Sequence, residues 1–263
     1  MPNIVLLLRD PCHATRIATR DPLHAETEFK KHWDDLYNSR HALIPDIQNS
    51  EVWRRKLQAC QARVCEQDGS QGGGLKTILR HFSFAKQRYE SCAAPQRKYC
   101  CMINAIALLL SMIAGDARQK HDVRERAGQA LDSMTPKSIA TAGLTADYNS
   151  VCMDFIRTLD TDDHDPALTA KQRDEFINNM RALSSRGYIA LQPPASVGDV
   201  DPPMTMTQIA TSQIDEMRVF EYGSKRKVLW NNGAAQCLKE LVARMHVVVD
   251  AMIARVQAEL TQT

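Results

Sequence analysis

The sequence is short of the residues that interrupt or cross-link a chain. Its 263 residues include only 11 glycines and 11 prolines, and aromatic residues make up 6%. A collagen-like chain needs glycine at every third position, and a disordered chain combines low hydrophobicity with high net charge. Neither description fits a chain that is 44% apolar with a formal net charge of +2. The length therefore predicts one large domain or two small ones, either able to bury a core.

No apolar run is long enough to predict a membrane span. The longest, residues 100–114, is shorter than the roughly 20 residues that a spanning helix needs, and Asn104 interrupts it. The run Ile4–Leu8 lacks the length and the preceding positive charge of a signal peptide. We expect a soluble intracellular protein with no membrane span, in the cytoplasm or nucleus, or in the virion if the protein is viral.

Cysteine patterns that bind metal are also missing. None of the eight cysteines has CxxC spacing, which argues against a structural zinc site. The acidic segment Asp160–Pro166 fails as a calcium loop, because Asp165 stands where glycine is required and Lys171 where glutamate is required. We expect free, mostly buried thiols and neither a metal nor another cofactor.

What the sequence does contain is helical periodicity along most of its length. Apolar spacings of three and four predict helices over residues 25–40, 51–67, 75–92, 95–114, 116–134, 145–159, 169–186, 205–217 and 233–260. The dipeptide Gly223-Ser224 lies between two short β-prone runs and predicts a hairpin. The expected fold class is all-α, a multi-helix bundle with one small β-hairpin near residues 218–230.

Two segments rich in chain-breaking residues predict the boundaries. The glycine-rich segment 68–74 lacks the spacing of a phosphate-binding loop, so we interpret it as a linker, and residues 193–203 are rich in proline. They delimit an N-terminal helical region (1–67), a central helical core (75–192) and a hairpin with a long C-terminal helix (204–263). The three ranges could also form one continuous domain.

Basic residues are concentrated in two places. Between residues 76 and 98 six bases stand against one acid, and the hairpin turn adds three bases, whereas residues 154–175 hold seven acids and three bases. A basic patch could neutralise the phosphates of RNA or DNA, or it could meet the acidic region of another subunit. The predicted nucleic-acid-binding residues are Lys76, Arg80, Lys86, Arg88, Arg97, Lys98, Lys225, Arg226 and Lys227.

Two short segments resemble known architectures. Tyr99-Cys-Cys-Met-Ile-Asn-Ala105 resembles the cysteine box of ubiquitin-specific and viral papain-like proteases, which implies a cysteine hydrolase with Cys101 as nucleophile, placed at the start of a buried helix. Those families also need a later histidine on a sheet, which is not evident here, and the alternative is a buried structural cysteine pair. Over residues 169–228, the predicted order of helix, strand, helix and hairpin resembles a winged-helix module.

The last predicted helix carries a heptad-like apolar stripe of Leu238, Leu241, Met245, Val248 and Met252. The stripe predicts either packing on the chain's own bundle or pairing with a second copy, and hence a homo-oligomer. The function expected is that of a non-enzymatic helical assembly or nucleic-acid-binding protein, such as a viral or phage structural protein or a regulator. The alternatives are the cysteine hydrolase using Cys101 and a helical protein–protein adaptor.

Overall fold

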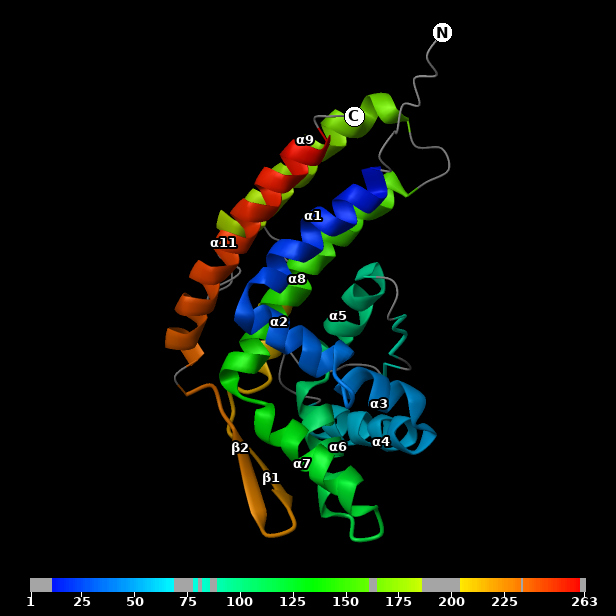
Figure 1. Ribbon diagram of the computed structural model, residues 1–263. Coiled ribbons are helices and arrows are strands. Elements are labelled where there is room, and N and C mark those ends of the chain that lie inside the picture. Colours follow the sequence, from blue (N-terminus) through cyan, green and yellow to red (C-terminus); the bar gives the residue numbers. More distant parts are fainter. Residues whose placement is uncertain are drawn as a thin grey trace.

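The computed structural model describes residues 11–68, 78–79, 82–85, 89–160, 165–185, 204–232 and 234–260. Over these ranges the chain is all-α apart from one antiparallel hairpin, which confirms the predicted fold class (Figure 1). The α-helices are α1 (Pro11–Ala25), α2 (Thr27–Trp33), α3 (Leu43–Asn49), α4 (Glu51–Asp68), α5 (Ala93–Cys101), α6 (Ile103–Gly115), α7 (His121–Ser133), α8 (Pro136–Leu159), α9 (Thr169–Ser185), α10 (Met206–Ser212) and α11 (Ala234–Leu260). A π-helix, η1 (Asp34–Asn38), and two 3-10 helices, η2 (Tyr89–Cys92) and η3 (Pro166–Leu168), complete the helical elements, and β1 (Arg218–Tyr222) pairs with β2 (Lys225–Leu229).

Helix α8 lies between two hydrophobic clusters and contributes side chains to both. In one cluster Leu144, Tyr148 and Ile156 of α8 pack with the long helices α1, α9 and α11, which run side by side in Figure 1. In the other, Ile139 and Ala142 of α8 join side chains of α3 to α7. Between these large side chains, the buried residues Ala140, Ala142, Gly143 and Ala146 let neighbouring helices approach α8 closely.

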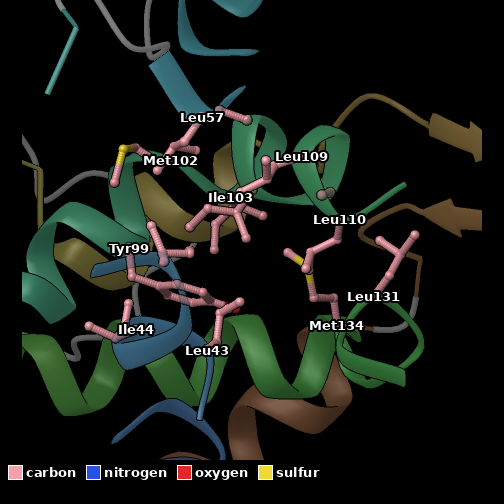
Figure 2. Close-up of a cluster of buried hydrophobic side chains, with 14 of the residues drawn as sticks. Leu43, Ile44, Leu57, Tyr99, Met102, Ile103, Leu109, Leu110, Leu131 and Met134 are labelled. Carbon is pink, nitrogen blue, oxygen red and sulfur yellow. The ribbon is translucent and has the colours of Figure 1, made fainter. Parts of the chain in front are cut away.

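The second cluster is centred on α6, the most apolar helix of the chain. Its side chains Leu109 and Leu110 are completely buried, in one cluster with Tyr99 of α5, Leu131 of α7 and Met134, which follows α7 (Figure 2). A helix that is apolar nearly all round is stable only when other elements surround it. The burial of α6 within the bundle meets this requirement.

A buried carboxylate fixes the short helix α10 on α8. Asp147 accepts hydrogen bonds from Met206 N at 2.7 Å, from Thr207 N at 3.0 Å and from Thr207 Oγ1 at 2.7 Å. Burial raises the pKa of Asp147, and these three hydrogen bonds oppose the shift. One turn earlier on α8, Gly143 leaves room for the backbone of Thr207 to lie against the helix.

The predicted helix over residues 75–92 is wrong where the structure describes it. Residues 78–79 and 82–85 are not helical, and only Tyr89–Cys92 forms a 3-10 turn. Two glutamine side chains replace the helical hydrogen bonds. The amide of Gln61 accepts from Leu79 N at 2.6 Å and donates to Leu79 O at 3.2 Å, and Gln48 binds Phe84 N and O in the same way, at 3.1 and 3.3 Å. Each amide imitates one bridge of a β-ladder.

The single helix predicted over residues 95–114 is instead two helices, α5 and α6, bent by 81° at Met102. Gln213, just after α10, binds both sides of the break. Its side-chain Nε2 donates to the carbonyl of Cys100 and its Oε1 accepts from Asn104 N at 3.5 Å, while its backbone carbonyl accepts from Asn104 Nδ2 at 2.9 Å. The backbone groups released by the break are thereby satisfied from a residue over a hundred positions away.

The predicted helices 51–67 and 205–217 begin close to where the sequence placed them, and side chains cap both. Ser50 Oγ accepts from Trp53 N at the start of α4, and Thr205 forms a capping box with Gln208 at the start of α10. Gly223 has φ of 59° in the hairpin turn, a conformation that favours glycine. The strand expected between the helices at 169–186 and 205–217 and both predicted boundary segments lie outside the described residues, apart from Asp68. The division of the chain into three ranges stays a prediction.

The winged-helix resemblance is not borne out by packing. Helix α9 packs on α8 and α11, whereas α10 packs on α8 and α5, and β1 packs on α6. The elements of residues 169–228 therefore belong to different parts of the bundle and do not form one module. The winged-helix order came from sequence adjacency, which long-range packing overrides.

The close approach of α8 and α10 predicts that Gly143→Ala destabilises the protein by about 1–3 kcal/mol. A Cβ at this position would lie 2.4 Å from Thr207 Cα and 2.9 Å from Thr207 N, both backbone atoms that cannot move aside cheaply. Urea denaturation followed by circular dichroism measures the change.

Gly128→Ala in α7 is the matched control. There the nearest atom to a new Cβ is Tyr222 Cε2, at 3.4 Å, so the better helix propensity of alanine should leave stability unchanged or raise it by up to about 1 kcal/mol. Equal stability of the two variants would contradict the account of the α8–α10 crossing.

Candidate functional site

The hairpin presents one apolar face to solvent. Strand alternation turns Phe220, Tyr222 and Leu229 toward the bundle, where they are buried, and turns Val219 and Val228 outward. Val219 and Val228 are directly opposite each other in the register and are 38% and 43% exposed. This pair is the centre of an apolar surface on an element that has no layer covering its outer side within the described residues.

Two larger side chains extend this surface beyond the strand ends. Met217 and Trp230 lie two residues from Val219 and Val228, and they are 59% and 45% exposed. We call the set Met217, Val219, Val228 and Trp230 the outer hairpin face. Exposed apolar residues that gather in one place, with tryptophan among them, are typical of protein-binding surfaces.

The inner side of the hairpin is anchored on Asp132 near the end of α7. Tyr222 Oη donates to the Asp132 carboxylate, and Lys227 Nζ donates to the Asp132 carbonyl at 2.7 Å. Lys225 Nζ lies 3.7 Å from Asp132 Oδ2 and 6.0 Å from the centre of the Tyr222 ring. Burial, together with the Asp132 carboxylate, raises the pKa of Tyr222 to about 12, so the phenol keeps its proton and remains a donor.

The structure separates the predicted basic residues that it describes. Lys225 and Lys227 contact Asp132, while Arg226 is exposed on the outer side opposite Glu221. Arg97 is exposed and Lys98 half-buried on α5, which lies in a different part of the molecule from the hairpin (Figure 1). Lys76, Arg80, Lys86 and Arg88 lie outside the described residues. Nucleic-acid binding by this set stays a prediction.

A second surface is a groove between α8 and α9. It encloses about 250 Å³ and is lined by Val151, Asp154, Phe155, Thr158, Gln172, Glu175, Phe176 and Asn179, which we call the α8–α9 groove. The rings of Phe155 and Phe176 stack with centroids 4.4 Å apart and planes 10° from parallel. Apolar residues thus form the floor.

The rim of the α8–α9 groove is acidic. Asp154 and Glu175 line it, and the described lining residues include no lysine or arginine. The nearest basic partners are loose and exposed: Arg157 Nη1 lies 4.0 Å from Asp154 Oδ1, and Lys171 Nζ lies 3.8 Å from Glu175 Oε1. Such exposed pairs contribute little, so both carboxylates remain available to a cationic partner.

Sequence reasoning found the acidic excess of residues 154–175 but not the groove. In the sequence, Val151 and Phe155 are only apolar positions of the helix predicted over residues 145–159. The facing side chain, Phe176, comes from the next helix, and nothing in a single helix's periodicity shows which neighbour it will stack against. The charge excess was the only available signal.

The geometry around Cys101 does not activate the thiol. Cys101 is the last residue of α5 and half-buried, not the first residue of a buried helix as the protease resemblance implied. Burial raises the pKa of Cys101, and Arg97 only partly opposes the shift. Cys100 is completely buried and burial raises its pKa well above the ordinary value. Among the described residues, no histidine hydrogen-bonds to either thiol.

In the part of the chain that the structure describes, no group of three or more histidine, cysteine, aspartate or glutamate side chains could hold a metal ion. No single helix there is long and apolar enough to cross a membrane; α5 and α6 reach the required length only as a pair, with the 81° bend between them.

No family model matches this chain, and neither does any curated protein or solved structure with which it was compared. Its function is therefore inferred from the surfaces themselves.

The cysteine geometry predicts slow thiol chemistry. Iodoacetamide should modify Cys101 slowly at pH 7 and faster as the pH rises toward its raised pKa, because only the thiolate attacks. Cys100 should resist modification until the protein unfolds. Peptide mass spectrometry after timed quenching reports both sites, and rapid loss of the Cys101 thiol at pH 7 would restore the hydrolase hypothesis.

Proposed function

We propose that the protein is a non-enzymatic helical assembly protein whose copies join head to tail. The outer hairpin face of one copy seats in the α8–α9 groove of the next. The observation that carries the proposal is that the two surfaces are complementary: one is an exposed apolar face and the other an apolar groove, and their charges are opposite. A projecting apolar face beside basic side chains occurs on the same chain as an apolar groove with an acidic rim.

The apolar parts of the two surfaces suit each other. Trp230 offers a large exposed ring, and the stacked rings of Phe155 and Phe176, which are 5% and 3% exposed, close the apolar bottom of the groove. Aromatic pairs stabilise contacts beyond the area that they bury, by about 0.5–1.5 kcal/mol each. Tryptophan is also among the residues most often found to dominate binding energy at interfaces.

The charges of the two surfaces are opposite in sign. Strands β1 and β2 carry four basic residues and one acidic residue, of which Lys225 and Arg226 are exposed near the turn. The groove offers Asp154 and Glu175. Opposite potentials speed the encounter of two proteins and select the docking register, with a strong dependence on salt.

The positions of the two surfaces determine the kind of assembly. The hairpin and α9 are at opposite ends of the molecule in Figure 1, so a hairpin cannot reach the groove of its own chain. Contacts between two different surfaces are heterologous, and they generate closed rings or open filaments. This arrangement distinguishes the proposal from a two-fold dimer.

The C-terminal helix supports this choice of surface. Its apolar stripe packs on α1, α8 and α9 of the same chain, and its side chains Met245 and Met252 are completely buried. Pairing through this stripe would require the helix to leave its own bundle. An oligomer formed through the hairpin needs no such rearrangement.

The proposal predicts a specific complementation between two blocked variants. Trp230→Ala removes the projecting surface and keeps the groove, whereas Asp154→Lys with Glu175→Lys reverses the rim and keeps the hairpin. Each variant alone should lose assembly, with association weakened by about 30-fold or more for Trp230→Ala if the side chain contributes 2 kcal/mol or more. Their mixture should form heterodimers and nothing larger. Sedimentation velocity separates these species.

The control for this experiment is Val247→Ala. Val247 is 68% exposed on α11 and belongs to neither surface, so its removal should leave assembly unchanged. A native protein that stays monomeric at high micromolar concentration, or a mixture of the blocked variants that stays monomeric, would overturn the proposal.

Nucleic-acid binding has a separate test. Fluorescence anisotropy with labelled RNA and DNA measures affinity as a function of salt, and each lost phosphate contact should reduce the slope of log K against log salt by about 0.7–0.9. Arg97→Glu with Arg226→Glu changes two exposed arginines. Binding by the native protein with a shallower slope in this variant would support a nucleic-acid role, and absence of binding by the native protein would remove it.

A further inference from the structure

A cleft separate from both assembly surfaces lies between α2, η1, α5 and α7. It encloses about 270 Å³. Buried side chains of Leu36, Leu43, Tyr99 and Met134 form its floor, together with His32. The rim is polar and exposed, with Asp35 and Gln129 on opposite sides, from η1 and α7. A depression with an apolar floor and a few polar groups is the usual form of a small-molecule site.

His32 is the unexplained group in this cleft. Its side chain is only 8% exposed, and its buried Nε2 has no hydrogen-bond partner among the described residues. Burial lowers the pKa of His32 to about 4, so the imidazole is neutral at neutral pH and one ring nitrogen carries a lone pair. The ring meets the edge of Tyr99 at 6.4 Å between centroids. A buried polar atom left unpaired is costly unless a ligand satisfies it.

Asp35 supplies the uncompensated charge at the rim. It is in η1, and π-helical turns often occur at functional sites because they displace side chains from helical positions. Asp35 has no hydrogen bond or ion pair within the described part of the chain. Partial burial raises its pKa, an effect that Lys31 opposes, although Lys31 does not line the cleft.

Among the described residues that line the cleft, Arg126 is the one arginine, and two carboxylates of the same chain already pair with it. Arg126 Nη1 donates to Asp46 Oδ2 at 3.2 Å, and Arg126 Nη2 lies 3.7 Å from Asp122 Oδ2. The same Nη1 lies 2.9 Å from Nδ1 of His41. Because two carboxylates share this guanidinium, the charge left for a ligand to meet is the negative charge of Asp35.

We propose that this cleft binds a small organic amine whose apolar body carries a hydroxyl group. The ammonium group pairs with Asp35 at the rim, the body rests on Leu36, Leu43 and Tyr99, and the hydroxyl hydrogen-bonds to His32 Nε2 on the floor. An anionic ligand would face Asp35 without a free cation beside it. A hydroxyl-bearing amine satisfies both unpaired groups at once.

Tyramine is the probe for the test, with two analogues that each lack one group. Tyrosol replaces the amine by a hydroxyl, and 2-phenylethylamine lacks the phenol. Titration calorimetry at millimolar ligand should give saturable binding of tyramine and at least about tenfold weaker binding of each analogue, because a hydrogen bond to a charged or buried group contributes that much. The labelled imidazole signal of His32 in NMR spectra should shift with tyramine but not with 2-phenylethylamine.

Asp35→Asn should weaken tyramine binding by at least about tenfold. The matched control is Asp34→Asn, which changes the adjacent carboxylate of the same π-helix; Asp34 pairs with Lys30 and does not line the cleft, so affinity should be unchanged. Equal binding of tyramine and tyrosol by the native protein, no saturable tyramine binding, or an unmoved His32 signal would each overturn the proposal. The analogue comparison needs no variant, so it decides even if Asp35→Asn fails to fold.

Discussion

The structure depends on the hydrogen bonds by which Asp147 holds α10 against α8. A buried carboxylate is costly to keep ionised, and here two backbone N–H groups and the Thr207 hydroxyl offset that cost. Gly143 allows the approach because a side chain there would overlap the Thr207 backbone. Once α10 is fixed, Gln213 can reach the break between α5 and α6. The hairpin follows directly, and Asn231 N returns to the Ile214 carbonyl at 2.8 Å. The contact between Asp147 of α8 and the start of α10 thus helps to position the outer hairpin face.

Much of the fold could be predicted from the sequence because local physics determines it. The capping residues Ser50 and Thr205, the turn at Gly223 and the periodicity of α4 and α11 act over a few residues, and the structure agrees with them. The errors occur where distant side chains replace local hydrogen bonds. Gln61 hydrogen-bonds to the backbone of Leu79 in a segment whose apolar spacing predicted a helix. The bend at Met102 is stabilised by Gln213, which follows α10. Periodicity contains no information about such partners.

In the candidate sites, too, local features could be predicted from the sequence, whereas contacts between distant residues could not. The basic turn of the hairpin was visible in the sequence, but its lysines serve partly as anchors on Asp132, and only the register shows that Val219 and Val228 face outward together. The α8–α9 groove and the cleft at His32 each combine side chains of separate elements. The apolar stripe of α11, for which the sequence allowed packing within the chain or pairing with a second copy, is buried within one chain. On the hairpin, by contrast, the four apolar side chains of the outer hairpin face stay exposed.

Zero-length cross-linking tests the central claim most directly. A carbodiimide joins a lysine amine to a carboxylate only when the two groups are in contact. Because Lys225 faces Asp132 of its own copy, the experiment uses Arg226→Lys, which places an amine on the outer side of the hairpin. Head-to-tail assembly predicts a link between position 226 of one copy and Asp154 or Glu175 of another, identified by mass spectrometry in the dimer band and absent from the monomer band. To prove that the link joins different copies, equal amounts of ¹⁴N- and ¹⁵N-labelled protein are mixed, and mixed-isotope peptides are expected. Dimers without this link, or linked instead through other surfaces, would contradict the account.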